Sequence, residues 1–106
     1  MKLRYTPAAR SDLREIREYI GGMLNNPIAA NRITAGILEN CSHLKEQPRM
    51  GAELSEKTGR ETDLRYLICG KHIAFYRIEK DTVSVIRILD GRTNYLRVLF
   101  QLQDSF

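Results

Sequence analysis

The chain has 106 residues, of which 42% are hydrophobic and 28% charged, and its formal net charge is +4. This length predicts a single domain, residues 1–106, with one core. No apolar run approaches the roughly 20 residues of a membrane span. The start, MKLRYTPAAR, has no signal-peptide core. We therefore expect a cytoplasmic protein without a membrane anchor.

The content of cysteine and histidine argues against a metal site. The sequence holds two cysteines, Cys41 and Cys69, and two histidines, which together form no ligand set of known spacing. Both cysteines lie inside apolar patterns. We expect buried, reduced thiols and neither a metal nor another cofactor.

The first half of the sequence predicts a short strand and then a helix. Lys2 to Tyr5 is the strand candidate, and Thr6-Pro7 is a cap followed by a helix-starting proline. The helix should end near Gly21-Gly22. One face should hold a stripe of apolar residues spaced by three or four: Ala9, Leu13, Ile16, Ile20 and Met23. The opposite face, which we expect to be solvated, carries Arg10, Asp12, Arg14, Glu15, Arg17 and Glu18.

A second helix begins at Asn26-Pro27 and is closed by Pro48. Its apolar stripe comprises Ala30, Ile33, Ile37, Cys41 and Leu44, widened by Leu38. Only a few residues separate the two helices, so they should lie antiparallel as a hairpin. Between Arg49 and Asp63 the apolar periodicity disappears, which predicts a loop of about 15 residues, a length that is often functional.

The second half predicts three strands and a tail. The strands are 64–68, 72–78 and 83–89, and the last two flank a polar turn. A turn centred on Lys80-Asp81 predicts the pairs Ile78–Val83, Tyr76–Val85 and Ala74–Arg87 on one face. On the other face it predicts Phe75–Ile86, Ile73–Ile88 and Arg77–Ser84. Both faces are largely apolar, so the helices should cover one, and the tail or another protein should cover the other.

The tail after Gly91 carries a short helical stripe of Tyr95, Leu96, Leu99 and Phe100, and residues 101–106 should fray. The predicted order is β-α-α-β-β-β with a short C-terminal helix or tail. This is an α+β domain in which a helical hairpin packs on a small antiparallel sheet.

Positive charge concentrates in the second half of the chain. The stretch from Leu64 to Phe100 holds seven basic and three acidic residues, a surplus of four that equals the surplus of the whole chain. Such a concentration is expected if the sheet or its rim meets an anionic partner, although arginines are also common on exposed strands.

Several segments together resemble the RelE/ParE superfamily of toxins from bacterial type II toxin–antitoxin systems. The resemblance rests on YTPAARSDLREIREYI, NPIAANRI, QPRMG and the sheet sequence from Leu64 to Phe100, and it covers about residues 4 to 100. It implies a RelE/ParE-like fold and neutralisation by an acidic antitoxin whose disordered segment folds over the toxin, in a hetero-oligomer. Growth inhibition and plasmid stabilisation are the biological roles that it implies.

The resemblance implies two different activities. Members of the RelE-like branch cleave ribosome-bound mRNA without metal, and for that chemistry the matching residues here are Arg65, Arg92 and Tyr95. Those ribonucleases have an arginine close to the place of Ile73, and isoleucine cannot stabilise phosphate charge. The pattern GKHIAFYRI followed by RILDGR instead resembles the ParE-like branch, which poisons DNA gyrase and has no established catalytic residues. We favour the ParE-like branch, leaving open a ribonuclease or an inactive remnant that binds only its antitoxin.

Some residues allow a structural and a functional interpretation. Tyr95 is either a proton-transfer group or a packing residue of the tail, and His72 is either a catalyst or a structural residue of the rim. Arg87, inside an apolar strand, needs an acidic partner such as Asp90 or Asp63, or it grips a partner molecule. The residues that we assign to target or antitoxin binding are Arg77, Arg87, Arg92, Arg97, Tyr76 and His72.

Overall fold

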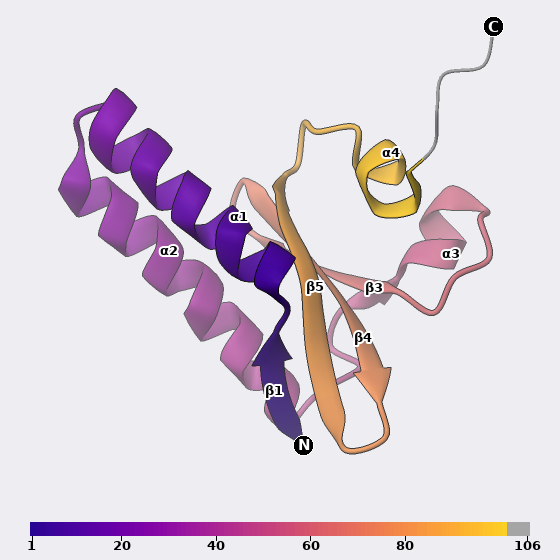
Figure 1. Cartoon of the computed structure of the whole chain (residues 1–106). Helices are drawn as coiled ribbons and strands as arrows, with labels where there is room; N and C mark the ends of the chain where they lie inside the picture. Colours follow the sequence, from indigo (N-terminus) through magenta and orange to yellow (C-terminus); the bar gives the residue numbers. More distant parts are fainter. Residues whose placement is uncertain (102–106) are drawn as a thin grey trace, which may run out of the picture.

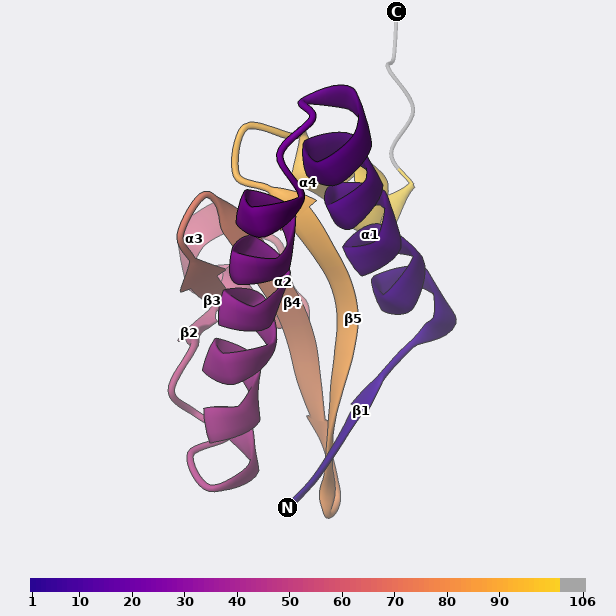
Figure 2. The same cartoon turned by 90° about the vertical axis from the view of Figure 1, so that its left-hand side faces the viewer.

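The computed structural model describes residues 1–101, and its central feature is a helical hairpin on a five-stranded sheet (Figure 1). Helices α1 (Pro7–Glu18) and α2 (Pro27–Ser42) lie side by side over one face. Short helices α3 (Leu54–Thr58) and α4 (Tyr95–Phe100) lie beyond the opposite face (Figure 2). The strands are β1 (Lys2–Tyr5), β2 (Ala52–Glu53), β3 (Arg65–Cys69), β4 (His72–Glu79) and β5 (Thr82–Asp90), in the spatial order β1-β5-β4-β3-β2. The predicted α+β class is confirmed.

Both long helices begin at the predicted caps. The side chain of Thr6 accepts a hydrogen bond from the amide of Ala9 at 3.1 Å, and that of Asn26 accepts one from Ala29 at 3.1 Å. The proline after each cap has no amide hydrogen to leave unsatisfied. Helix α1 runs into a π-helical turn, Tyr19–Met23, that contains the two predicted breaking glycines. These local signals set the ends of the hairpin.

Two expectations for α1 are wrong. Asp12 was expected to be solvated, but it is buried, because this side of α1 faces β5 and a basic partner there. Met23 was expected in the apolar stripe, but 84% of it is exposed. The π-helical turn has more residues per turn than an α-helix, so it rotates Met23 out of the stripe. On α2, Leu38 is also exposed, while Ala30, Ile37 and Cys41 are buried as expected.

The β4–β5 hairpin keeps the predicted register only near its turn. Tyr76 lies opposite Val85, Arg77 opposite Ser84 and Ile78 opposite Val83, as predicted. A bulge then leaves Ile86 without a partner, so the predicted pairs Phe75–Ile86, Ala74–Arg87 and Ile73–Ile88 are wrong. The observed pairs are Phe75–Arg87, Ala74–Ile88 and Ile73–Leu89. One extra residue in a strand shifts all later pairs, and alternation alone does not reveal it.

The sheet is mixed, because β1 pairs in parallel with β5 while the other pairs are antiparallel. The register places Lys2 opposite Thr82 and Tyr5 opposite Val85. The α1–α2 hairpin is part of the connection that allows this parallel pairing. We had expected a wholly antiparallel sheet, since the sequence pattern of a short strand does not show which edge it joins.

The segment predicted as a loop, Arg49 to Asp63, contains β2 and α3. Strand β2 pairs with Arg65 and Tyr66 of β3, and Leu54 at the start of α3 is fully buried. A single buried leucine has no periodicity, which is why the pattern predicted no element here. Gly51 allows the close approach, because a Cβ atom there would lie 2.5 Å from the Tyr66 carbonyl oxygen and 2.7 Å from the Tyr76 hydroxyl.

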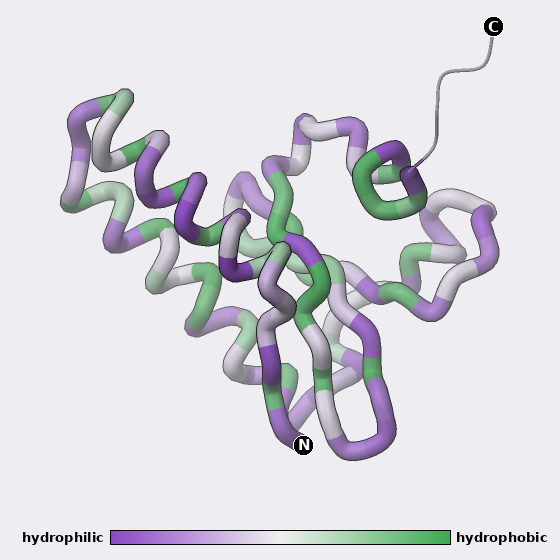
Figure 3. Tube along the Cα trace, in the orientation of Figure 1, coloured by the Kyte–Doolittle hydropathy of each residue, from purple (hydrophilic) through white to green (hydrophobic). Residues whose placement is uncertain are grey.

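The second face of the sheet is covered by the chain itself. Phe75, Ile73 and Leu89 pack with Leu54 and Leu64, and side chains of α4 close over this cluster. Figure 3 shows hydrophobic residues along the central strands and on α4, with hydrophilic residues at the β4–β5 turn. We expected either the tail or another protein to cover this face, and the tail contributes to the cover through α4. The C-terminal segment, expected as a short helix or a tail, forms helix α4. Of the stretch 101–106 that we expected to fray, residues 102–106 lie outside the described residues.

Candidate functional site

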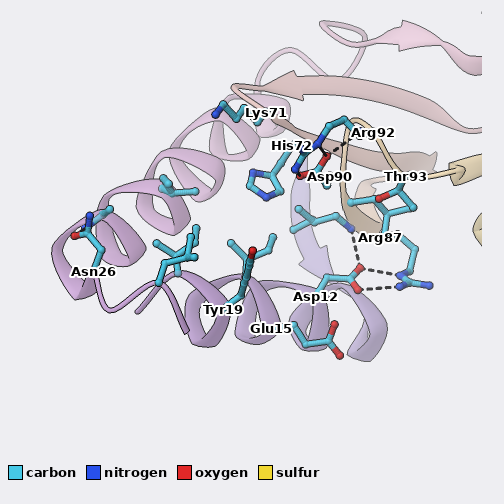
Figure 4. Close-up of a pocket in the computed structure, with 17 residues that line it drawn as sticks. Asp12, Glu15, Tyr19, Asn26, Lys71, His72, Arg87, Asp90, Arg92 and Thr93 are labelled. Atoms are coloured by element: carbon cyan, nitrogen blue, oxygen red, sulfur yellow. Dashed lines mark hydrogen bonds and ion pairs between the residues drawn. The ribbon is translucent and has the colours of Figure 1, made fainter. Parts of the chain in front are cut away.

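A cleft of about 600 Å³ opens between the helical hairpin and the ends of β4 and β5 (Figure 4). Its apolar lining includes Ile16, Ile20, Leu24, Ile33, Ile88 and Leu89. Its charged and histidine lining comprises Asp12, Glu15, Lys71, His72, Arg87, Asp90 and Arg92. A cavity of this size and composition is suited to a ligand or to an anchoring side chain of a protein partner.

An ion pair between Arg87 and Asp12 closes one end of the cleft. The Nε and Nη2 atoms of Arg87 donate to the two carboxylate oxygens of Asp12 at 2.7 and 2.8 Å. The amide of Ile88 donates to the same carboxylate at 2.9 Å. The hydrogen bond with Asp12 raises the pKa of Arg87, and burial opposes this effect. We expected Asp90 or Asp63 as the acidic partner, and Asp12 takes that place because α1 packs on β5.

Asp90, Arg92 and His72 lie on the sheet side of the cleft, where β5 ends and β4 begins (Figure 4). Arg92 donates to Asp90 through its backbone amide at 2.8 Å and through Nε and Nη2 at 3.1 and 3.2 Å. These bonds lower the pKa of Asp90 to about 2. His72 lies opposite Asp90 in the β4–β5 register. Partial burial lowers the pKa of His72, and the charge of Asp90 partly opposes this. The net effect favours the neutral imidazole.

Arg65 lies away from this cleft and is bound to the backbone around β2. Its Nη2 atom donates to the carbonyl oxygens of Arg49 and Gly51 at 3.2 and 2.7 Å, and Nη1 lies 3.5 Å from a Glu53 carboxylate oxygen. Only 13% of the Arg65 side chain is exposed. Its guanidinium thus holds the segment before β2 in place.

Tyr95 lies on the second face of the sheet. Its ring centre is 5.2 Å from that of Phe75, and the Nζ atom of Lys57 lies 5.9 Å from the Tyr95 ring centre and 5.0 Å from that of Tyr66. A second cation, Arg60, lies 4.5 Å from the Phe100 ring centre. The sequence pattern gives no signal for Lys57 and Arg60, because only the fold of residues 49–63 brings them to these rings.

The three residues of the ribonuclease hypothesis do not converge. Arg65 is the cross-strand partner of Tyr76, and such partners share a face of the sheet. Tyr76 belongs to the core under the helices, whereas Tyr95 packs with Phe75 on the opposite face. Arg92 lines the cleft. The structure instead brings Arg87, Arg92 and His72 together there.

The other residues assigned to binding are dispersed. Arg77 pairs with Asp63, with its Nε atom 3.1 Å from the carboxylate, and Arg97 is exposed on α4. Tyr76 is fully buried, and its hydroxyl donates to the Pro48 carbonyl oxygen at 2.7 Å and accepts from the Gly51 amide at 3.0 Å. Its assignment to a binding surface is therefore corrected. The Tyr76 ring packs in the core under the helices, and its hydroxyl is already hydrogen-bonded within the chain.

Two further properties concern residues 1–101. No group of three His, Cys, Asp or Glu side chains in this range is placed to hold a metal ion. None of the helices in the same range is long and apolar enough to cross a membrane.

A family model described as the ParE toxin of the type II toxin–antitoxin system, parDE, matches residues 3–95. The chain belongs to the ParE toxin family. The resemblance to the RelE/ParE superfamily is thereby confirmed, and the chain is a toxin of the type II toxin–antitoxin class. No curated protein sequence matches the chain.

Solved structures of toxin–antitoxin systems have the same fold. One is from the chromosomal ParDE system of P. aeruginosa, with 23% identity and a TM-score of 0.72, covering 85% of this chain and 95% of that one. Another is from the RelBE2 toxin–antitoxin complex of Mycobacterium tuberculosis, with 25% identity and a TM-score of 0.61, covering 84% of this chain and 95% of that one.

Proposed function

We propose that this ParE-family toxin inhibits growth by binding an essential macromolecule without cleaving it. DNA gyrase is the first target to test, by analogy with ParE-like members. The family match over residues 3–95 supports this choice of branch. A role in plasmid stabilisation belongs to the same proposal.

The observation that carries this proposal is the separation of Arg65 from Tyr95. Catalysis of RNA cleavage needs a cation at the phosphate and a proton-transfer group within hydrogen-bond reach of the same reacting atoms. Arg65 shares the face of Tyr76, and its guanidinium binds two carbonyl oxygens. Tyr95 packs on Phe75 behind the sheet. Buried Ile73 supplies no charge. This arrangement favours binding over catalysis.

A ribosome-dependent mRNA endoribonuclease is the second candidate, and Lys57 is the observation that favours it. The Nζ atom of Lys57 lies above the rings of Tyr66 and Tyr95. Aromatic rings beside cations are typical of surfaces that bind single-stranded nucleic acid. In this second reading Lys57 would provide the phosphate contact that Arg65 does not offer.

A cognate antitoxin is the proposed partner in cells. The neighbouring structures come from a ParDE system and a RelBE2 complex, which supports an antitoxin here and a hetero-oligomer of the two chains. Arg10, Arg14 and Arg17 are exposed and, at helical spacings of four and three, share one face of α1. None of them forms an ion pair among the described residues. This stripe suits an acidic antitoxin segment.

Two assays test the proposal. The first measures bacterial growth after induced expression of the chain, and the second maps a reporter mRNA by primer extension after cell-free translation with the purified chain. We expect growth to stop, co-expression of the cognate antitoxin to restore it, and the mRNA to remain intact. New mRNA ends that appear only with ribosomes would replace binding by the ribonuclease reading. Normal growth at high expression would contradict both.

A further inference from the structure

The tip of the helical hairpin exposes large apolar side chains that continue the lining of the cleft. This tip patch consists of Tyr19, Met23, Leu24 and Ile28, which are exposed by 49%, 84%, 58% and 79%. Tyr19 and Leu24 also line the cleft, so patch and cleft form one surface. Contiguous exposed apolar surface beside a cavity is typical of a protein-binding site with a buried anchor.

The charges that line the cleft indicate which charges a binding partner should carry. The lining contains three acidic residues (Asp12, Glu15 and Asp90) and three basic ones (Lys71, Arg87 and Arg92), so it has no net charge when His72 is neutral. Four of these six neutralise one another as the pairs Arg87–Asp12 and Arg92–Asp90. Glu15 on α1 and Lys71 before β4 form no ion pair among residues 1–101. The cleft thus has one acidic residue, Glu15, whose charge also acts on Arg87, and one basic residue, Lys71, that form no ion pair of their own.

This balance fits a partner different from an acidic antitoxin. A strongly acidic segment gains no net attraction from a lining without net charge, whereas the arginine stripe of α1 offers it three unpaired cations. An apolar anchor flanked by one basic and one acidic residue matches the cleft, because the basic residue meets Glu15 and the acidic one meets Lys71. Folded protein surfaces commonly present such mixed charges around an apolar side chain.

We infer that the cleft and the tip patch are the surface by which this toxin binds its protein target. The target inserts an aliphatic or aromatic side chain between Ile20, Ile33 and Ile88, and the tip patch flanks that anchor. The inference rests on the proposed function, because it assigns the target-binding role to one surface and leaves the antitoxin to another.

Charge introduced into the tip patch tests the inference without disturbing the core. Met23→Glu and Ile28→Glu place carboxylates at the two most exposed positions of the patch. Ile28 lies in the first turn of α2, where a carboxylate favours the helix. Ile68→Glu is the matched control, because Ile68 is 62% exposed and pairs with Ile73, which packs on the opposite face. Circular dichroism and thermal melting establish that each variant folds.

Each variant is expressed from a titratable promoter, with and without the cognate antitoxin. We expect wild type and Ile68→Glu to inhibit growth equally, and Met23→Glu and Ile28→Glu to need at least about tenfold more protein for the same inhibition. Lys71→Glu should shift the dose in the same direction. The antitoxin should still bind all four variants in a pull-down.

Three results would overturn the inference in distinguishable ways. Undiminished toxicity of folded Met23→Glu and Ile28→Glu would exclude this surface as the target site while leaving the proposed function intact. Undiminished toxicity together with loss of antitoxin binding would assign the surface to the antitoxin. A wild-type chain that does not slow growth would reject the proposed function, and the inference with it.

Discussion

The ion pair between Asp12 and Arg87 should be the main polar contribution to the stability of the helix–sheet contact. Asp12 is 6% exposed and accepts three hydrogen bonds, two from Arg87 and one from the amide of Ile88. Asp12→Ala removes both carboxylate oxygens, and with them all three hydrogen bonds, and leaves the buried amide of Ile88 without a partner. An unsatisfied buried donor costs about 1–3 kcal/mol.

The cost of the broken ion pair adds to this. Removing one member of a fully buried pair costs about 3–5 kcal/mol, but 29% of the Arg87 side chain is exposed and can be hydrated again. We therefore expect Asp12→Ala to lower the free energy of unfolding by about 3 kcal/mol in total. For a domain of about 100 residues this corresponds to a fall in Tm of roughly 12–24 °C.

Urea denaturation followed by circular dichroism measures the effect. The matched control is Asp63→Ala, which breaks the Arg77–Asp63 pair, whose side chains are 37% and 66% exposed. Such an exposed pair contributes about 1 kcal/mol or less. The double variant Asp12→Ala/Arg87→Met should be less destabilised than the sum of its single variants, because no charge is left behind. A loss for Asp12→Ala no larger than that for Asp63→Ala would refute this reasoning.

Three further predictions follow from single contacts. Tyr76→Phe should lower the free energy of unfolding by about 1–3 kcal/mol, because the buried amide of Gly51 loses its acceptor; a urea transition unchanged from wild type would disprove it. In the folded chain the pKa of Asp90 lies near 2, below the ~4 of an unfolded aspartate, so its charged form stabilises the chain above pH ~4 and this contribution is lost as the pH falls toward 2. The difference in Tm between wild type and Asp90→Asn should therefore shrink over that range, and a constant difference in melting curves would speak against the Asp90–Arg92 contact. Tyr95→Phe should leave growth inhibition unchanged, since its ring packs on Phe75; loss of toxicity in this folded variant would indicate proton transfer by the phenol.

Local signals in the sequence were sufficient for the helical hairpin, and they indicated the tail helix as one of two possible forms of the C-terminal segment. The Thr6 and Asn26 caps act within three residues along the chain, so the sequence contains everything that sets these helix starts. The tail helix is likewise set by a stripe at helical spacing. Features that depend on contacts between distant segments could not be predicted in the same way.

The predictions that were wrong mostly concern residues whose positions depend on contacts between segments far apart in the sequence. Asp12 belongs to the polar face of α1 by pattern, and only the packing of α1 on β5 buries it against Arg87. The unpaired Ile86 at the bulge and the parallel pairing of β1 also depend on contacts far along the chain. Elements of two and five residues, such as β2 and α3, are too short to show a period.

The candidate site was predicted only in part for the same reason. His72, Arg87 and Arg92 were assigned to binding as separate residues, and the cleft that they share exists only because the α1–α2 hairpin packs beside β5. The tip patch was missed because Met23 was placed in the apolar stripe, although the π-helical turn exposes it. Lys57 lies in a segment without apolar periodicity, so the sequence pattern did not predict its contact with the Tyr66 ring.

A supercoiling assay with purified DNA gyrase tests the central claim most directly. Binding without catalysis predicts that the wild-type chain blocks supercoiling in proportion to the amount of gyrase present, and that Tyr95→Phe blocks it equally well. The opposite result has two parts: supercoiling continues in excess toxin, and mRNA is cleaved in the presence of ribosomes by far less toxin than ribosomes. That result would contradict binding without catalysis and make this chain an enzyme.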